Sequence, residues 1–155
     1  MGTLIAIAGA GLAAILCGIG SAVGVQMGGK AAAGVLSEKP ELFGKLLLLQ
    51  ALPGTQGIYG FLTAILLASR IGLLGGGVPA LDEATGWAFF GACMPIAIVG
   101  FISALYQGAT AVSAIHMTAK QPDASVKGMT MTALVETYAI LTLLISILLI
   151  FGIPV

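Results

Sequence analysis

The sequence predicts an all-α membrane protein in which four transmembrane helices form two tandem hairpins, and three observations support this fold class. First, 59% of the 155 residues are hydrophobic, only 8% are charged, and the mean hydropathy is +1.12. Such a composition suits lipid rather than water. Second, the apolar residues fall in four runs, each long enough to cross a hydrocarbon core about 30 Å thick. Third, the second half of the chain repeats the first.

The four predicted spans cover residues 4–36, 43–70, 86–118 and 127–152. We expect the first run to be a span and not a secretory signal peptide, because no positive charge precedes it and its apolar stretch is too long. Both cysteines, Cys17 and Cys93, fall inside apolar spans, with no neighbouring residues at metal-ligand spacing. We therefore expect both to be unpaired packing residues.

Lysines orient the predicted spans. Lys39 and Lys45 flank the first loop, and Lys120 and Lys127 flank the third, whereas the middle connection contains Asp82 and Glu83. Because lysine and arginine accumulate on the cytoplasmic side of membrane proteins, the loops near 37–43 and 119–126 are predicted to be cytoplasmic and both termini to lie outside.

The repeat aligns without gaps at a shift of 82 residues. Gly18 and Ser21 then coincide with Gly100 and Ser103, and the outer helices match as well. This predicts one hairpin in residues 1–80 and a second in residues 81–155, both pointing the same way across the membrane. Parallel repeats imply a rotation axis along the membrane normal, and a homo-oligomeric ring is the natural closure.

Small residues indicate which helices pack most closely. The first span carries glycine at every fourth position, at 20, 24 and 28, and the third repeats the pattern with Gly100, Ala104 and Gly108. Such spacing lets helix backbones approach each other in lipid. The spans at 43–70 and 127–152, richer in leucine and isoleucine, are then expected to form an outer layer against lipid.

One acidic residue, Glu136, lies well inside a span, nine residues after Lys127. Placing a carboxylate at this depth costs several kcal/mol, so an intramembrane acid indicates a functional site. Its counterpart in the first repeat is Gly54, which leaves one such carboxylate for every four helices.

Other polar residues are expected at the depth of Glu136. Counting from the turn of the second hairpin places Gln107 opposite the acid, and the same count places Thr55 and Gln56 at this level in the first hairpin. Tyr59 shares a helical face with them and is expected to hold the carboxylate. Pro53 should interrupt the helix beside them. Carboxylate, amide, hydroxyl and backbone oxygens suit a small hard cation, although threonine, glutamine and tyrosine also join membrane helices without a ligand.

Three segments carry a family resemblance: residues 52–60 (Leu-Pro-Gly-Thr-Gln-Gly-Ile-Tyr-Gly), Tyr106-Gln107-Gly108, and residues 135–139 (Val-Glu-Thr-Tyr-Ala). Together they resemble the duplicated proteolipid of V-type (V/A-type) ATPases, and most closely the K subunit of bacterial sodium-pumping members. The resemblance implies a membrane rotor ring in a bacterial cell membrane. It also implies that Glu136 carries Na⁺, that Leu52 (through its carbonyl), Thr55, Gln56 and Gln107 complete the site, and that Tyr59 closes over Glu136.

The same resemblance implies partners: identical subunits in the ring, a stator membrane subunit that supplies an arginine, a central-stalk subunit at the cytoplasmic loops, and membrane lipid. The chain has no Gly-x-x-x-x-Gly-Lys-Ser/Thr motif, so we expect a non-catalytic subunit without an ATP site. Its net charge of +0 argues against nucleic-acid binding.

Three alternatives remain open at this level. One is a rotor subunit that carries H⁺ on the same carboxylate. Another is a small proton-coupled transporter of organic cations. Such a transporter needs aromatic rings near the acid to bind the cation, whereas the one tryptophan of the sequence, Trp87, lies near a span end. A third is a passive structural pore, which leaves Glu136 unexplained.

Overall fold

The computed structural model describes residues 1–77 and 80–155, and the regular secondary structure in these residues is helical. The elements in chain order are α1 (Gly2–Leu36), η1 (Pro40–Leu42), α2 (Phe43–Ala51), η2 (Leu52–Gly54), α3 (Thr55–Arg70), η3 (Leu73–Gly75), α4 (Glu83–Lys120), η4 (Pro122–Ala124) and α5 (Ser125–Gly152). Four helical stretches are long and apolar enough to cross a membrane: Gly2–Leu36, Pro40–Arg70, Glu83–Lys120 and Pro122–Gly152. This confirms the four predicted spans, each of which is a few residues longer than expected.

The second span is not one continuous α-helix. The short 3₁₀ turn η2 separates α2 from α3, and Pro53 lies in its centre. Proline has no backbone N–H and cannot make the usual bond to the carbonyl four residues earlier, so the helix tightens at this point. The expected interruption therefore takes the form of a single 3₁₀ turn.

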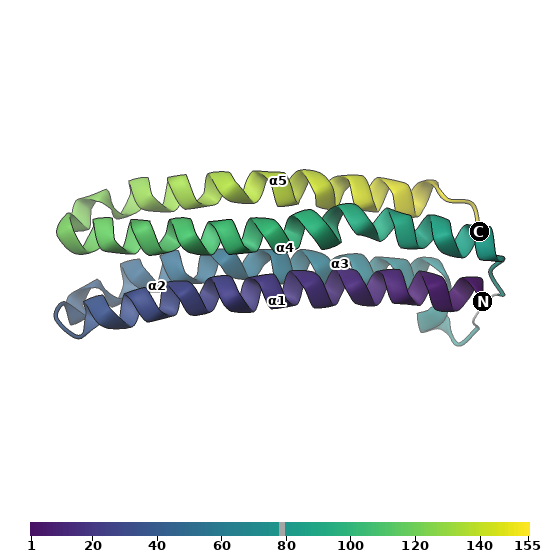
Figure 1. Cartoon of the computed structure of the whole chain (residues 1–155), viewed down its shortest axis with the longest axis horizontal. Helices are drawn as coiled ribbons and strands as arrows, with labels where there is room; N and C mark the ends of the chain where they lie inside the picture. Colours follow the sequence, from purple (N-terminus) through teal and green to yellow (C-terminus); the bar gives the residue numbers. More distant parts are fainter. Residues whose placement is uncertain (78–79) are drawn as a thin grey trace.

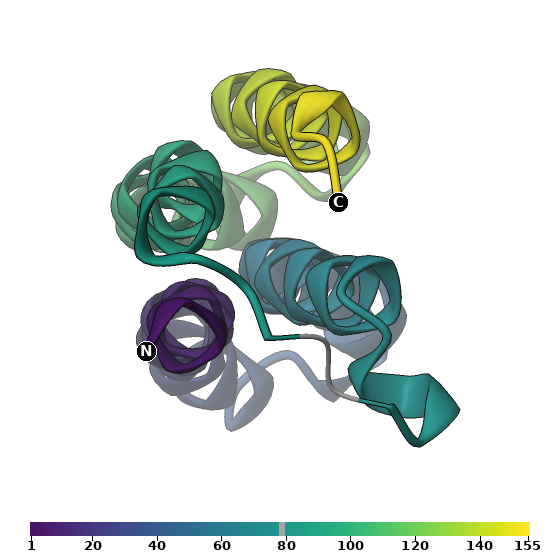
Figure 2. The same ribbon diagram turned by 90° about the vertical axis from the view of Figure 1, so that its right-hand side faces the viewer.

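The four spans run side by side along the length of the molecule (Figure 1). Both termini lie at one end, and the α1–η1 and α4–η4 turns lie at the other. The end-on view shows α1 and α4 in one layer and α3 and α5 in a second layer (Figure 2). The share of buried residues in the most apolar stretch of each span is highest for the α4 span, at 44%, and lowest for the α5 span, at 22%. The hairpin boundary at residue 80, beside residues 78–79 that lie outside the description, stays a prediction.

Glycines allow α1 and α4 to come into backbone contact. A Cβ placed on Gly20 would lie 2.8 Å from the Phe101 carbonyl oxygen, and one on Gly24 would lie 2.6 Å from that of Ala104. A Cβ on Gly108 would lie 2.6 Å from the Gly24 Cα. These distances leave no room for a side chain, which confirms that the predicted small-residue pattern is a packing surface. Gly28, the third position of the pattern in α1, faces Gln50 of α2 instead.

Backbone groups beside Pro95, which lies inside α4, bond neighbouring side chains. The Ile96 N–H donates to Ser146 Oγ at 3.3 Å, and Cys17 Sγ donates to the Ile96 carbonyl at 3.2 Å. Cys17 and Cys93 are both free and buried, as predicted. Side-chain partners of this kind are what makes a proline tolerable within a membrane span.

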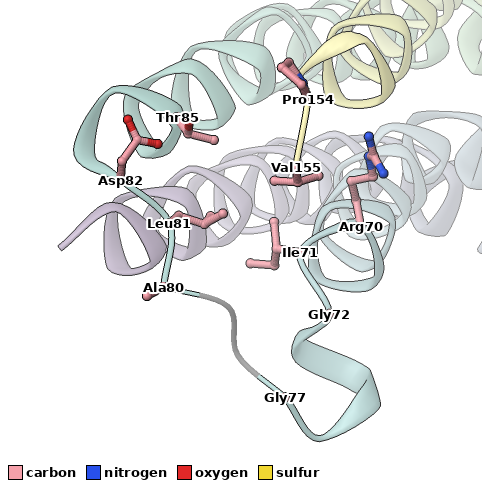
Figure 3. Close-up of a pocket in the computed structure, with 10 residues that line it drawn as sticks. All are labelled: Arg70, Ile71, Gly72, Gly77, Ala80, Leu81, Asp82, Thr85, Pro154 and Val155. Carbon is pink, nitrogen blue, oxygen red and sulfur yellow. The ribbon is translucent and has the colours of Figure 1, made fainter.

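Polar contacts join the two hairpins at both ends. Lys39 Nζ donates to the Ala119 carbonyl at 2.5 Å, and Lys45 Nζ donates to the Pro122 carbonyl at 2.9 Å. At the end that holds the termini, a cavity of about 820 Å³ is lined by Arg70, Asp82, Val155 and their neighbours (Figure 3). There the Arg70 guanidinium donates to the Ile153 carbonyl at 3.2 Å. Arg70 thus lies at a span end, away from Glu136.

Candidate ion-binding site

Glu136 lies midway along α5, half-buried, with both carboxylate oxygens bonded to side chains of other helices. The Tyr59 hydroxyl of α3 donates to Oε1. Gln107 Nε2 of α4 donates to Oε2 at 3.4 Å. Gln107 and Glu136 thus face each other, and Tyr59 contacts the carboxylate. These donors fix the orientation of the acid.

Two fully buried glutamines connect the carboxylate to the first hairpin. Gln56 and Gln107 each have 0% exposure, and Gln56 Nε2 donates to Gln107 Oε1 at 2.5 Å. Gln107 Nε2 also donates to the Thr132 carbonyl at 3.2 Å. Buried amides are costly unless their hydrogen bonds are made. The pair therefore forms an ordered polar connection between α3 and α4.

The 3₁₀ turn brings the Leu52 carbonyl and the Thr55 hydroxyl beside Gln56. Thr55 Oγ1 lies 3.1 Å from the Leu52 carbonyl oxygen and 3.4 Å from Gln56 Oε1. The Thr55 backbone N–H also donates to the Leu52 carbonyl, which keeps that carbonyl and the Thr55 hydroxyl together. The residues predicted as ligands, Leu52, Thr55, Gln56, Gln107 and Glu136, are thus linked by an unbroken series of short polar contacts.

Two residues that contact this network were not predicted from the sequence. Ser103 Oγ accepts from Gln56 Nε2 at 3.2 Å and donates to the Val135 carbonyl at 3.1 Å. Thr132 supplies the carbonyl that accepts from Gln107. A signal existed, since each lies four residues before a predicted site residue and therefore on the same helical face. Serine and threonine are so common in membrane helices that this spacing alone was not informative.

The ligand chemistry available here is that of oxygen atoms. No group of three histidine, cysteine, aspartate or glutamate residues that could hold a metal ion occurs within residues 1–77 and 80–155. The cluster instead combines one carboxylate with uncharged amide, hydroxyl and carbonyl oxygens. Such a set suits a hard cation of low charge, because hard cations take several oxygen ligands.

The glycines of α1 touch the segments that carry this polar network. A Cβ on Gly24 would lie 2.7 Å from Pro53 Cβ, beside Leu52, as well as 2.6 Å from the Ala104 carbonyl oxygen of α4. Gly24 also contacts Gly108, next to Gln107. α1 therefore fixes the distance between the two segments that supply the glutamines.

Comparison with known proteins shows which family has this duplicated sequence. The family model for the C subunit of ATP synthase matches the chain twice, over residues 8–67 and 90–149. The chain belongs to this family. Both ends of the second match lie 82 residues beyond those of the first, which is the shift found within the sequence. The chain is therefore a duplicated rotor-ring proteolipid in which each hairpin is one copy of the family's unit.

Three relatives are consistent with the duplication. The chain is 44% identical over 149 residues, 96% of its own length and 92% of the relative's, to the K subunit of the V-type sodium ATPase of Enterococcus hirae. It is 39% identical over 145 residues to the K subunit of the A-type ATP synthase of Methanocaldococcus jannaschii, covering 94% of this chain and 61% of that protein. Subunit c of the ATP synthase of Clostridium novyi is 44% identical over 71 residues, which are 43% of this chain and 83% of that protein. A shorter relative thus matches about one half of the duplicated proteolipid.

Proposed function

We propose that this rotor-ring proteolipid carries Na⁺ across the membrane on Glu136 as part of a V-type ATPase. The observation that carries the proposal is the continuous series of polar contacts that brings the side chains of Thr55, Gln56, Gln107 and Glu136 and the Leu52 carbonyl together. The Enterococcus relative, which is the K subunit of a sodium ATPase and matches nearly the whole chain, supports Na⁺ as the ion.

The chemistry follows from the charges. One carboxylate neutralises one monovalent cation, so the loaded proteolipid has no net charge at this depth and can turn through lipid. An unloaded carboxylate is costly there. An arginine on a stator membrane subunit would pair with the exposed carboxylate and displace the ion. The only arginine of this chain, Arg70, lies at a span end, so that group must come from another protein.

The remaining assignments complete the proposal. The turns near 37–43 and 119–126, with their lysines, face the cytoplasm and a central-stalk subunit, and both termini lie outside. ATP is hydrolysed elsewhere in the complex. Identical subunits and membrane lipid surround each copy.

Chemical modification of Glu136 by a carbodiimide tests the proposal, since carbodiimides react with the protonated acid. The purified ring would be labelled across pH with Na⁺, with K⁺ or with neither. We expect Na⁺ to slow the labelling in proportion to its concentration and K⁺ to have no such effect. Glu136→Gln is the matched control, because it keeps the size of the side chain and removes the reactive acid.

The outcomes separate the alternatives. Labelling that depends on pH but is indifferent to Na⁺ would indicate an H⁺-carrying rotor. Labelling insensitive to both would indicate a passive assembly, and protection by an organic cation would indicate a transporter.

A further inference from the structure

Ser103 of α4 carries a buried hydroxyl that joins three helices. Its side chain is only 4% exposed. The Ser103 oxygen accepts from Gln56 Nε2 of α3 at 3.2 Å, and the hydroxyl donates to the Val135 carbonyl of α5 at 3.1 Å. A serine hydroxyl has one proton, so an oxygen that has donated this proton can only accept from its other partner. Ser103 therefore faces the nitrogen of the Gln56 amide and not its oxygen.

The orientation of the Gln56 amide decides what this side chain offers to a cation. Only the carbonyl oxygen of an amide can bind a cation, because the nitrogen carries two donor hydrogens. With Nε2 turned toward Ser103, Oε1 lies 3.4 Å from Thr55 Oγ1, beside another predicted ligand. A half-turn of the amide would exchange the two groups and place the nitrogen there. The proposed site therefore needs a contact that favours one orientation.

Acceptors at the far end of the network require the same orientation. The Thr132 carbonyl and Glu136 Oε2 accept from Gln107 Nε2 at 3.2 Å and 3.4 Å. Because a backbone carbonyl can only accept, Gln107 turns its nitrogen toward α5 and its oxygen toward Gln56. Gln56 Nε2 donates to that oxygen at 2.5 Å. The direction of these hydrogen bonds thus follows from a backbone carbonyl at each end of the network, Thr132 and Val135.

A second serine holds the backbone beside Gln56. Ser21 of α1 is the repeat counterpart of Ser103, and its Oγ accepts from the Gly57 N–H at 2.8 Å. Gly57 follows Gln56 directly in the first turn of α3. The backbone of this segment is therefore tied to α1, and the freedom left to Gln56 is that of its side chain.

We propose that Ser103 is a positioning residue that keeps the Gln56 amide oxygen turned toward the bound cation. The inference rests on the proposed function, since it takes Na⁺ as that cation. Gln107 Oε1 is itself a predicted ligand, so a cation bound to it competes with the hydrogen bond that this oxygen accepts from Gln56. Ser103 is not a predicted ligand and remains available to the Gln56 amide as an acceptor when the site is loaded.

This role concerns Na⁺ and not H⁺. A proton needs only the Glu136 carboxylate, whereas a hard metal cation needs several oxygen ligands. Ser103 bonds Gln56 and the Val135 carbonyl, and within residues 1–77 and 80–155 no hydrogen bond joins it to Glu136. Removing the Ser103 hydroxyl should therefore weaken Na⁺ binding and leave the protonation of Glu136 unchanged.

Carbodiimide labelling of Glu136 in purified rings of the full chain tests the proposal. The labelling rate is measured against Na⁺ concentration and, separately, against pH without Na⁺. Ser103→Ala removes the hydroxyl. Ser103→Cys keeps the size of the side chain but has a sulfur that accepts hydrogen bonds weakly, and it gives the same test if Ser103→Ala rings do not assemble. The matched control is Ser113→Ala, an exposed serine of α4 that bonds the Ala109 carbonyl of its own helix at 3.4 Å.

We expect the loss of the Ser103 hydroxyl to raise the half-protecting Na⁺ concentration about three- to tenfold, which is the effect of one uncharged hydrogen bond. The pH dependence measured without Na⁺ should coincide with that of the unaltered ring. Ser113→Ala should stay within about twofold of the unaltered ring in Na⁺ protection.

Three results would overturn the proposal while Na⁺ still protects the unaltered ring, so that the proposed function stands. The first is unchanged Na⁺ protection after loss of the hydroxyl, and the second is equal weakening in Ser113→Ala. The third is a shift of the pH dependence together with Na⁺ protection, or failure of both Ser103 variants to assemble, which would mean that Ser103 serves only the packing of its three helices. If Na⁺ does not protect the unaltered ring, the proposed function fails and this inference fails with it.

Discussion

Replacing Gln107 by leucine tests the proposed site at a residue that makes three hydrogen bonds. Gln107 is fully buried, its amide nitrogen donates to Glu136 Oε2 at 3.4 Å and to the Thr132 carbonyl at 3.2 Å, and its oxygen accepts from Gln56 at 2.5 Å. Leucine keeps a similar volume and removes all three contacts. Gln56 retains one partner, because its Nε2 also donates to Ser103 Oγ at 3.2 Å.

The size of the effect follows from these contacts. A hydrogen bond to a charged group contributes about 1.5 to 3 kcal/mol. At ~1.4 kcal/mol per tenfold change in affinity, Gln107→Leu should weaken Na⁺ binding roughly 10- to 100-fold. The loss of an oxygen ligand acts in the same direction. The readout is the Na⁺ concentration that halves the rate of carbodiimide labelling of Glu136 in assembled rings.

A surface glutamine supplies the control for this experiment. Gln121 lies exposed in the turn before η4, so Gln121→Leu should leave the half-protecting Na⁺ concentration within about twofold of the original. If Gln107→Leu rings assemble and are protected at the original Na⁺ concentration, the reasoning about the site is refuted.

Three further predictions follow from individual contacts. Tyr59→Phe removes the hydroxyl that donates to Glu136 and should weaken Na⁺ protection about tenfold, with rings still formed; unchanged protection would show that the hydroxyl does not hold the acid. Thr132→Val should change Na⁺ protection by less than about threefold, because Gln107 bonds the Thr132 carbonyl and the Thr132 hydroxyl bonds the Gly128 carbonyl at 2.8 Å; a large loss would place the hydroxyl itself at the ion. Gly24→Ala should destabilise the folded chain by about 1–3 kcal/mol, since its Cβ has no room, as measured by denaturation in detergent micelles. Gly11→Ala, whose Cβ would meet no atom within 4 Å, should be neutral or slightly stabilising; equal losses at both positions would contradict the packing argument.

Much of the fold was predictable because lipid imposes a simple rule on the chain. Four apolar runs of sufficient length gave the spans, and a gapless repeat gave two parallel hairpins. The ends of the spans were less predictable, because charged and small polar residues near the turns, such as Glu83 and Lys120, continue a helix without adding hydrophobicity. The 3₁₀ turn around Pro53 was predicted as an interruption, but proline alone does not determine whether a helix bends, tightens or stops.

The candidate site was predictable to the extent that its residues are unusual in a membrane. Glu136, Gln56 and Gln107 stand out because charged and amide side chains are rare at this depth. Counting residues from the Pro122 turn placed Gln107 opposite Glu136, and the structure has them in contact. Ser103 and the Thr132 carbonyl were not predicted as part of the site, because a backbone oxygen carries no sequence signal and serine is common in membrane helices.

The position of Gly24 has a consequence for how the proteolipid would distinguish ions by radius. Gly24 lies against Pro53 on one side and α4 on the other, so the missing side chain sets the width of the gap across which Gln56 and Gln107 meet. A larger residue that the fold tolerated would widen that gap by tenths of an ångström while leaving all proposed ligands in place. In a mutational scan for preference between Li⁺, Na⁺ and K⁺, position 24 should therefore score alongside the oxygen-bearing residues, although it lies on a helix that contributes no proposed ligand.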